Sequence, residues 1–182
     1  MRKILTLAVV ALMQCGTASA QVEVSAEIGY GLHDGGLGYD TYELDVAGAY
    51  RFGKHFSIGA GTGIGNIDYG GGTYKNAAFW PVFARARYNL LAKGWSPFAK
   101  MDYGYAFSLR EHIGDHGLFF RPAIGLDIPL RKGKIYVQVG YTTRKLKTKV
   151  YLPGTQYGPG ADFYEHGHHD MFDFSLGYTV SF

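Results

Sequence analysis

The sequence predicts an all-β fold, an eight-stranded antiparallel up-and-down transmembrane β-barrel, from three observations. Large apolar residues alternate with small or polar residues in repeated segments of about ten residues, the period of a strand with two different faces. Short, glycine-containing connections alternate with long ones. No apolar run outside the first 20 residues reaches the length of a membrane-spanning helix. Since only helices and closed barrels satisfy the backbone in lipid, a membrane protein of this kind must be a barrel.

Residues 1–20 predict a cleaved secretory signal peptide, which leaves residues 21–182 as one barrel domain. Arg2 and Lys3 precede the apolar run Ile4–Met13, and Ala18-Ser19-Ala20 is a cleavage site of small residues. Ten apolar residues are too few to span a bilayer.

Cleavage removes the only cysteine, Cys15, so we expect no disulfide and no thiol chemistry in the mature chain. It also removes two basic residues and no acid, which lowers the formal charge from +3 to +1. This charge gives no support for nucleic-acid binding.

The first three predicted strands run from 22 to 32, 42 to 52 and 56 to 65. The first alternates Val, Ala, Ile, Tyr and Leu with Glu, Ser and Gly, and the second alternates Tyr, Leu and Val with Glu, Asp and Ala. The third sets Phe, Ile, Ala and Thr against Ser57 and four glycines. Because the four glycines carry no side chains, we expect this face to leave room for the long side chains Phe83, Arg85 and Arg87 of the next strand.

The next three predicted strands run from 79 to 90, 96 to 108 and 118 to 130. Their apolar positions hold Trp, Val, Ala, Met, Tyr, Phe, Ile and Leu, and their other positions hold Arg, Lys, Asp and Gly. Proline cannot donate to a strand ladder. We therefore expect Pro81, Pro97, Pro122 and Pro129 to lie near strand ends.

The seventh predicted strand, 135 to 144, sets Ile, Val and Tyr against Gln, Gly, Thr and Arg. The eighth, 172 to 182, alternates Phe, Leu, Tyr and Val with Asp, Ser, Gly and Thr and ends on Phe182. We expect this strand to close the barrel by pairing with the first, 22 to 32.

The connections predict an orientation. Short turns are expected at 53–55, around 92–94 and at 131–134, and longer loops at 33–41, 66–78, 109–117 and 145–171. Short periplasmic turns and long outer loops are the pattern of an outer-membrane barrel, whose two chain ends are then both periplasmic.

Two soluble architectures compete with this prediction. A lipocalin-like barrel would place its apolar residues inside, and a sandwich would show Greek-key connections. Aromatic residues favour the membrane barrel, because they fall at both ends of the apolar face, as the two interfacial belts of a barrel do. The expected belts are Tyr30, Tyr42, Trp80, Tyr105, Phe107, Phe120 and Tyr141 at the loop ends, and Phe52, Phe56, Tyr88, Trp95, Tyr178 and Phe182 at the turn ends.

The polar face predicts a charged lumen. Eight strands enclose only enough room for side chains, and buried charges require partners. We expect a packed ionic network that leaves no continuous channel, in which Asp173 pairs with Arg121 and Arg144. The competing interpretations are a narrow ion path or an acid–base site. The predicted lumen residues are Glu23, Glu27, Glu43, Asp45, Asp102, Asp127 and Asp173, with Arg51, Arg85, Arg87, Lys100, Arg121 and Arg144.

The whole chain after residue 20 resembles the small outer-membrane barrels of the OmpA/OmpX kind. The segments 96–99 (SPFA) and 119–126 (FFRPAIGL) resemble the outer membrane protein beta-barrel domain family. The resemblance implies an integral protein of the bacterial outer membrane, in contact with its lipids and lipopolysaccharide. It also implies that the assembly machinery reads the terminal strand through Tyr178, Val180 and Phe182. We expect a monomer with a structural or surface-interaction role, and the loop 145–171 as the segment for an extracellular partner.

Two further hypotheses concern chemistry. His166, His168 and His169 are spaced closely enough to bind a divalent metal, against the simpler interpretation of a solvated polar loop. Some barrels modify lipid A, and a lipid A-modifying enzyme, deacylase-like or acyltransferase-like, is the alternative function. Such deacylases carry a His-x-Ser arrangement with a nearby carboxylate on the outward surface. The one His-x-Ser of this sequence, His55-Phe56-Ser57, falls at a predicted turn, and its Ser57 belongs to the inward face of the third strand. We expect no enzyme and no cofactor.

Overall fold

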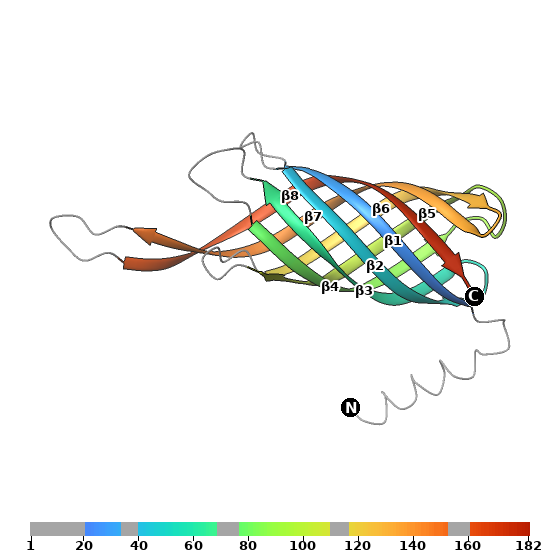
Figure 1. The fold of residues 1–182 in the computed structure, drawn as a ribbon, viewed down its shortest axis with the longest axis horizontal. Coiled ribbons are helices and arrows are strands. Elements are labelled where there is room, and N and C mark those ends of the chain that lie inside the picture. The colour runs from blue at the N-terminus through green and yellow to red at the C-terminus, as the bar shows by residue number, and fades with distance from the viewer. Residues whose placement is uncertain (1–20, 34–39, 69–76, 110–116, 153–160) are drawn as a thin grey trace, which may run out of the picture.

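The protein forms a closed barrel of eight antiparallel strands in sequence order (Figure 1). The structure is a computed structural model, which describes residues 21–33, 40–68, 77–109, 117–152 and 161–182, with only the backbone at 77, 146–152 and 161–168. The strands are β1 Gln21–His33, β2 Asp40–Phe52, β3 Phe56–Asp68, β4 Ala77–Asn89, β5 Ser96–Ser108, β6 Gly117–Leu130, β7 Gly133–Leu152 and β8 Ala161–Ser181. The predicted fold class and strand number are therefore confirmed. No helix long and apolar enough to cross a membrane occurs in these ranges.

The barrel closes between its first and last strands. β1 pairs with β8 from Glu23↔Ser181 to His33↔Met171, so no edge strand is left along the body of the barrel. The predicted pairing of the terminal strand with the first strand is confirmed. The predicted signal peptide, 1–20, lies outside the described residues.

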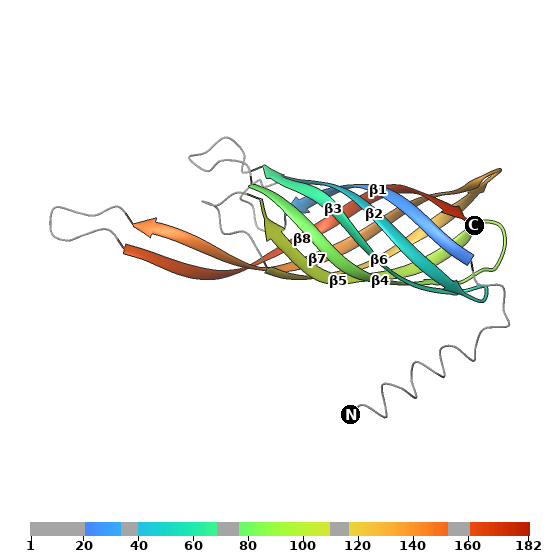
Figure 2. The same ribbon diagram turned by 60° about the horizontal axis from the view of Figure 1, so that its bottom comes forward.

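Three connections, 53–55, 90–95 and 131–132, join strands at the end of the barrel that also holds the C-terminus (Figure 2). Gly53 and Gly94 have φ of 65° and 76°, a left-handed conformation that favours glycine. The β6–β7 turn is tighter than predicted, because Leu130 already pairs with Gly133 and only Arg131 and Lys132 lie between the strands. The turn predictions are confirmed, with this refinement.

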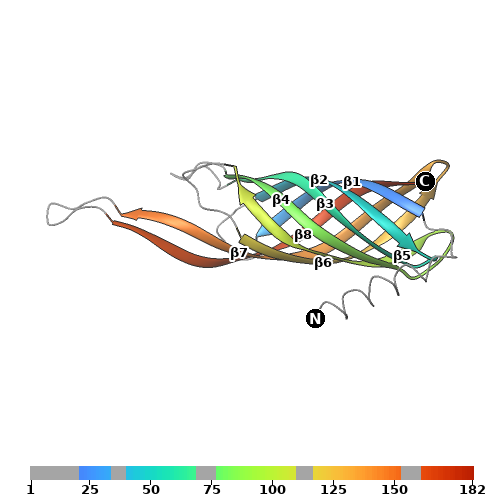
Figure 3. The same ribbon diagram turned by 90° about the horizontal axis from the view of Figure 1, so that it is seen from below.

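The predicted loop 145–171 is wrong for most of its length. β7 and β8 continue as a paired ribbon past Arg144↔His169 to Leu152↔Ala161, and this ribbon extends beyond the other strands (Figures 1 and 3). Lys145, Lys147 and Lys149 alternate with Leu146 and Val150, so the period of a strand continues beyond Arg144. Antiparallel pairing between two neighbouring strands does not require a buried face, which allows the ribbon to extend as a pair.

Two prolines lie inside strands, contrary to the prediction that they sit near strand ends. The β3–β4 ladder is interrupted between Thr62↔Val82 and Gly65↔Phe79, where Pro81 lies, but the register is unchanged across the gap. The β6–β7 ladder is interrupted in the same way around Pro122. A proline removes one donor without shifting a register that the rest of the strand fixes.

Burial alternates with a period of two along the strands, and the apolar side faces outward. Ile28, Ile124 and Leu176 are among the outward side chains, with 65%, 65% and 54% of their surface exposed. The charged residues at alternate positions are buried inside. The barrel is thus inverted relative to a soluble barrel, which excludes the lipocalin-like alternative.

Candidate functional site

The lumen is the part of the molecule where chemically active groups gather. All predicted lumen residues point inward, and all but Arg51, which is half-buried, are buried. They come from every strand except β3, whose inward positions are mostly glycine. Their ion pairs form three layers along the barrel axis.

The layer nearest the long loops is centred on Arg121 of β6. Its guanidinium donates from Nη1 to Glu43 Oε2 at 2.5 Å and from Nη2 to Asp45 Oδ2 at 2.6 Å. Arg144 donates to the other oxygen of Glu43 at 2.8 Å. Because β6 and β2 lie on opposite sides of an eight-stranded barrel, these contacts cross the whole lumen.

The middle layer is centred on the carboxylate of Glu27. It accepts hydrogen bonds from Lys100 Nζ at 2.9 and 3.0 Å and from Arg85 at 3.2 Å. Tyr136 and Gln138 donate to it at 2.9 and 2.7 Å. With up to four lone-pair sites, the carboxylate is saturated by these donors.

Asp102 connects the middle layer to the layer nearest the long loops. Arg85 donates to its two oxygens from Nε and Nη2 at 2.8 and 2.9 Å, the two-point geometry that guanidinium and carboxylate prefer. Lys100 lies 3.4 Å and Arg121 lies 3.2 Å from Oδ2 of Asp102. The two layers therefore form one continuous network.

The layer nearest the turns contains two carboxylates and three bases. Arg51 pairs with Glu23 at 2.5 Å, and Arg87 pairs with Asp127. Lys134 Nζ lies 3.9 Å from Glu23 and 3.8 Å from Asp127, so it connects the two pairs. Sequence reasoning missed Lys134, which it placed in a turn. Lys134 lies two residues before Tyr136 and four before Gln138, so it shares the inward face of that strand, which was the available signal.

Lys134 also balances the charge of the lumen. Among the described residues, the seven predicted acids now face the six predicted bases and Lys134, seven groups of each sign. All of these acids except Asp173 lie within ion-pairing distance of a base, which avoids the cost of burying an uncompensated ion.

Asp173 does not have the partners predicted for it. Among the described residues no base lies within ion-pairing distance of its carboxylate, and its partner is the hydroxyl of Thr142, which donates to Oδ2. Arg121 and Arg144 are instead engaged by Glu43 and Asp45. The strand pairing explains the difference, since Asp173 pairs with Gly140 on β7 and Thr142 is the next inward residue along that strand.

Aromatic side chains fill the space between the charges. Phe79, Phe83 and Phe119 are buried in the loop-side half, and Phe98 and Tyr136 are buried in the turn-side half. An added Cβ at Gly65 or Gly61 would lie 2.0 Å from Phe79 or 2.5 Å from Phe83. The inward glycines of β3 thus make room for the rings of two phenylalanines. The prediction that these glycines also make room for Arg85 and Arg87 is wrong, because the side chains of the two arginines point to Asp102 and Asp127.

The aromatic rings also face the guanidinium groups. Arg87 lies 3.6 Å from the ring centroid of Phe98, and Arg144 lies 4.0 Å from that of Phe79. The Nε atoms of both arginines have no hydrogen-bond partner among the described residues. Stacking on a ring face offsets part of that loss.

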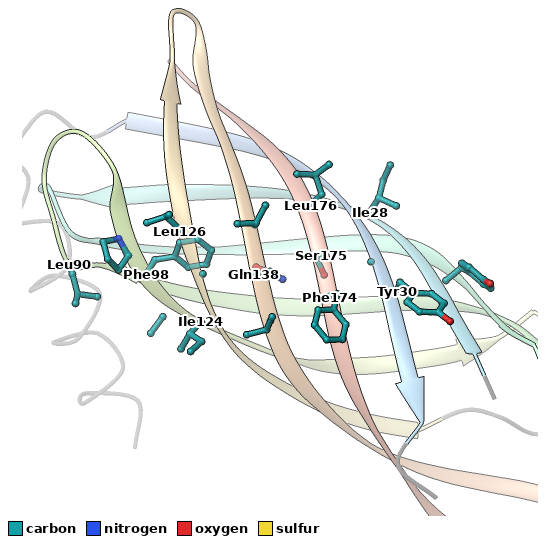
Figure 4. A pocket seen from close by; sticks show the side chains of 17 residues that line it. Ile28, Tyr30, Leu90, Phe98, Ile124, Leu126, Gln138, Phe174, Ser175 and Leu176 are labelled. Carbon is teal, nitrogen blue, oxygen red and sulfur yellow. The ribbon is translucent and has the colours of Figure 1, made fainter. Parts of the chain in front are cut away.

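The outward surface carries a shallow hollow of about 960 Å³ that spans several strands (Figure 4). Its lining includes Ile28, Ile124 and Leu176 from β1, β6 and β8, and none of its lining residues is charged. The hollow lacks the convergent polar groups of a catalytic pocket.

Both predicted aromatic belts face outward. Trp80 and Phe107 pack at 5.7 Å between ring centroids at the loop end, and Phe52 and Phe56 pack at 6.2 Å at the turn end. Tyr178 and Phe182 also point outward, and the amide of Phe182 donates to the carbonyl of Val22 at 2.9 Å.

Of the predicted metal ligands, His166 and His168 have side chains outside the described part of the chain. His169 lies against His33 of β1, with ring centroids 4.9 Å apart. Within the described ranges no group of three or more His, Cys, Asp or Glu is arranged to hold a metal. The lipid A-modifying activity stays a sequence-based alternative.

Comparison by sequence finds no matching family model and no matching curated protein. The fold is similar to that of the outer membrane protein OprG from Pseudomonas aeruginosa, with TM-score 0.58 and 10% identity over 90% of this chain and 96% of that one. It is also similar to Neisserial surface protein A, with TM-score 0.54 and 11% identity over 90% and 97% of the two chains. The outer membrane protein AlkL gives TM-score 0.53 and 15% identity over 92% of each chain. At these identities the likeness shows the fold, that of the small outer-membrane barrels.

Proposed function

We propose that this chain is an integral protein of the bacterial outer membrane, with a structural or surface-interaction role and a lumen that does not conduct ions. The observation that carries the proposal is the combination of an apolar outer surface with a lumen of paired charges on one closed barrel. The solved structures with this fold are described as outer membrane or surface proteins, which supports the same location.

The apolar surface supports membrane insertion. Exposed large hydrophobic side chains occur on all eight strands and surround the barrel. Monomeric soluble proteins rarely expose a contiguous apolar patch larger than a few hundred Å². Acyl chains would cover this surface, and the two aromatic belts would lie at the interfaces.

The ion pairs across the lumen support a closed barrel. Arg121 reaches from β6 to Glu43 and Asp45 on β2, and Lys100 reaches from β5 to Glu27 on β1. Both connections join opposite sides of the barrel at successive depths. An ion that entered the lumen would have to displace charged groups from their partners, at the cost of leaving a buried charge unpaired.

The unequal ends support an orientation with the turns in the periplasm. At the turn end, two of the connections have only three and two residues and the third has six, whereas the other end has connections of six to eight residues and the extended β7–β8 ribbon (Figure 3). In this orientation the ribbon projects away from the cell, where it is suited to contact lipopolysaccharide or an extracellular partner. Residues 1–20 would direct export, and Tyr178, Val180 and Phe182 would be read by the assembly machinery.

Gel mobility tests membrane insertion. The chain without residues 1–20 is folded into detergent or lipid vesicles and run with and without boiling. We expect the unboiled barrel to migrate differently from the boiled chain and to stay with the vesicles after carbonate washing. A chain that is washed off as a soluble folded protein would contradict the proposal.

Planar-bilayer recording tests the closed lumen. We expect no stable unit conductance from the wild-type barrel. The matched variant is Arg121→Ala/Lys100→Ala, which removes cross-lumen contacts from both connected layers and is expected to conduct in bursts. Well-resolved unit conductance of the wild type would overturn the closed-lumen part of the proposal.

Cysteine labelling on whole cells tests the orientation. The mature chain contains no cysteine, so Lys145→Cys at the loop end and Lys54→Cys at the turn end give single-site probes. A maleimide that cannot cross the outer membrane should label Lys145→Cys only. Labelling of Lys54→Cys alone would reverse the orientation.

A further inference from the structure

At the turn end of the barrel, the exposed charged side chains that the structure describes are all basic. Lys54, Lys93, Arg131 and Lys132 are all exposed there, one or two in each of the three turns. No acidic side chain in the described part of the chain is fully exposed, and the two acids near this end, Glu23 and Asp127, are buried and paired. The turn end therefore presents a cationic surface to its surroundings.

One part of this surface is a built groove. The β6–β7 turn, with Arg131 and Lys132, packs against Val180 and Ser181 at the end of β8, and a groove of about 460 Å³ lies between them. The hydroxyl of Tyr178 donates to the carbonyl of Lys132 at 3.0 Å and holds the turn in place. Lys134 lines the groove from within, where Glu23 and Asp127 share its charge.

The surroundings of the groove indicate the chemistry of its occupant. Leu130 and Phe182, with 48% and 76% of their surface exposed, flank it on the apolar outer face. An anion bound between Arg131 and Lys132 would thus lie where the apolar belt ends and the polar rim begins. An amphiphile with an anionic phosphate and acyl chains fits both features, whereas a free anion would leave the apolar flank uncovered.

We propose that the groove between the β6–β7 turn and the end of β8 binds the phosphate group of an anionic glycerophospholipid. Arg131 and Lys132 hold the phosphate, and the acyl chains lie along Leu130 and Val180. The inference rests on the membrane-spanning barrel proposed above, and in that orientation the lipid belongs to the periplasmic leaflet. The other turns, with Lys54 and Lys93, carry similar charge without being part of this groove.

The test compares two double variants that lose equal charge. Arg131→Gln/Lys132→Gln alters the groove, and Lys54→Gln/Lys93→Gln alters the other two turns. Each purified barrel in detergent is titrated with phosphatidylglycerol, and with phosphatidylcholine for comparison, and bound lipids are counted by native mass spectrometry. A basic residue near an anionic membrane surface contributes about fivefold in affinity, so the groove variant should bind phosphatidylglycerol about 25-fold more weakly and the control variant within about twofold of wild type.

Three outcomes would overturn the site. Equal weakening in both variants would mean a diffuse cationic rim, and no weakening in either would mean that the groove does not bind the lipid. Displacement of the lipid by inorganic phosphate at equal concentration would mean a phosphate site that ignores the acyl chains. Gel mobility of every variant is measured first, so that a failure of the barrel to insert is distinguished from a failure to bind lipid.

Discussion

Arg121 on β6 and Asp45 on β2 meet across the lumen, with Arg121 Nη2 2.6 Å from Asp45 Oδ2. Among the described residues Arg121 is the base within ion-pairing distance of Asp45, whereas Glu43 has a second partner in Arg144. The relationship joins strands that are four apart in a barrel of eight. Among the described residues, Asp45 therefore depends on a single base for its compensating charge.

Arg121→Met is therefore expected to lower the free energy of unfolding by about 3–5 kcal/mol, because it leaves Asp45 buried without a compensating charge. Urea unfolding of the barrel in lipid vesicles measures the change. The double variant Arg121→Met/Asp45→Asn should recover part of the loss, and Lys54→Met, on the surface, should change stability by less than about 0.5 kcal/mol. Equal stability of Arg121→Met and wild type would show that the pair does not stabilise the barrel.

Gly65→Ala is expected to destabilise the barrel by about 1–3 kcal/mol, the usual cost of overpacking. The three atoms nearest to the added Cβ all belong to the ring of Phe79, at 2.0 to 2.6 Å. Gly48→Ala is the matched control, because an added Cβ at Gly48 of β2 meets nothing within 4 Å. The same vesicle unfolding assay measures both, and Gly65→Ala/Phe79→Ala should cost less than the sum of its single variants. If the destabilisation of the double variant equalled the sum of the two single variants, the ring of Phe79 would not occupy the space left by Gly65.

Thr62→Val is expected to cost about 1–3 kcal/mol, because it leaves polar groups of β4 unsatisfied at the lipid-facing surface. Thr62 Oγ1 donates to the carbonyl of Pro81 at 2.9 Å and accepts from the indole of Trp80 at 2.6 Å. The hydroxyl of Thr62 thus satisfies polar groups of β4 at the point where Pro81 interrupts the backbone hydrogen bonds between β3 and β4. Thr62→Ser keeps the hydroxyl and should cost clearly less. Indistinguishable midpoints for the valine and serine variants would refute the role of the hydroxyl.

Ile124→Arg tests the lipid-facing assignment. Ile124 lies in the middle of β6 with 65% of its surface exposed, and an arginine near the bilayer midplane costs about 2–4 kcal/mol in a barrel of this type. Leu91→Arg, equally outward but in the β4–β5 turn, should cost about 0–1 kcal/mol, as for positions near the interface. Unfolding from vesicles gives both values. If both variants were as stable as wild type, the outer surface would face water.

The faces of the strands could be predicted closely from the sequence. Side-chain direction in a strand depends only on residue parity, so Glu27, Arg85 and Asp102 could be assigned to the interior before any partner was known. The same parity would have included Lys134 and the inward aromatic residues Phe79 and Tyr136. They were missed because a strand start was placed too late and because apolar residues were assumed to face outward.

The partners within the lumen could not be predicted in the same way. Asp173 was expected to meet Arg121 and Arg144, but its contact is with Thr142, and the two arginines meet Glu43. Contact between inward residues depends on the relative height of strands around the barrel. The relative height of two distant strands is set by the pairing registers of all the strands between them. An uncertainty of one residue in a turn therefore changes which inward side chains meet.

The sequence by itself determined the number of strands, the two faces of each and the sign of the charges inside, because alternation is a local property of the chain. Only the tertiary structure decided that Arg121 reaches Asp45, that glycines of β3 receive Phe79 and Phe83, and that β7 and β8 extend as a paired ribbon to Leu152 and Ala161. Closure and register bring together residues that are remote in the chain, and no local pattern encodes the distance between opposite walls of a barrel.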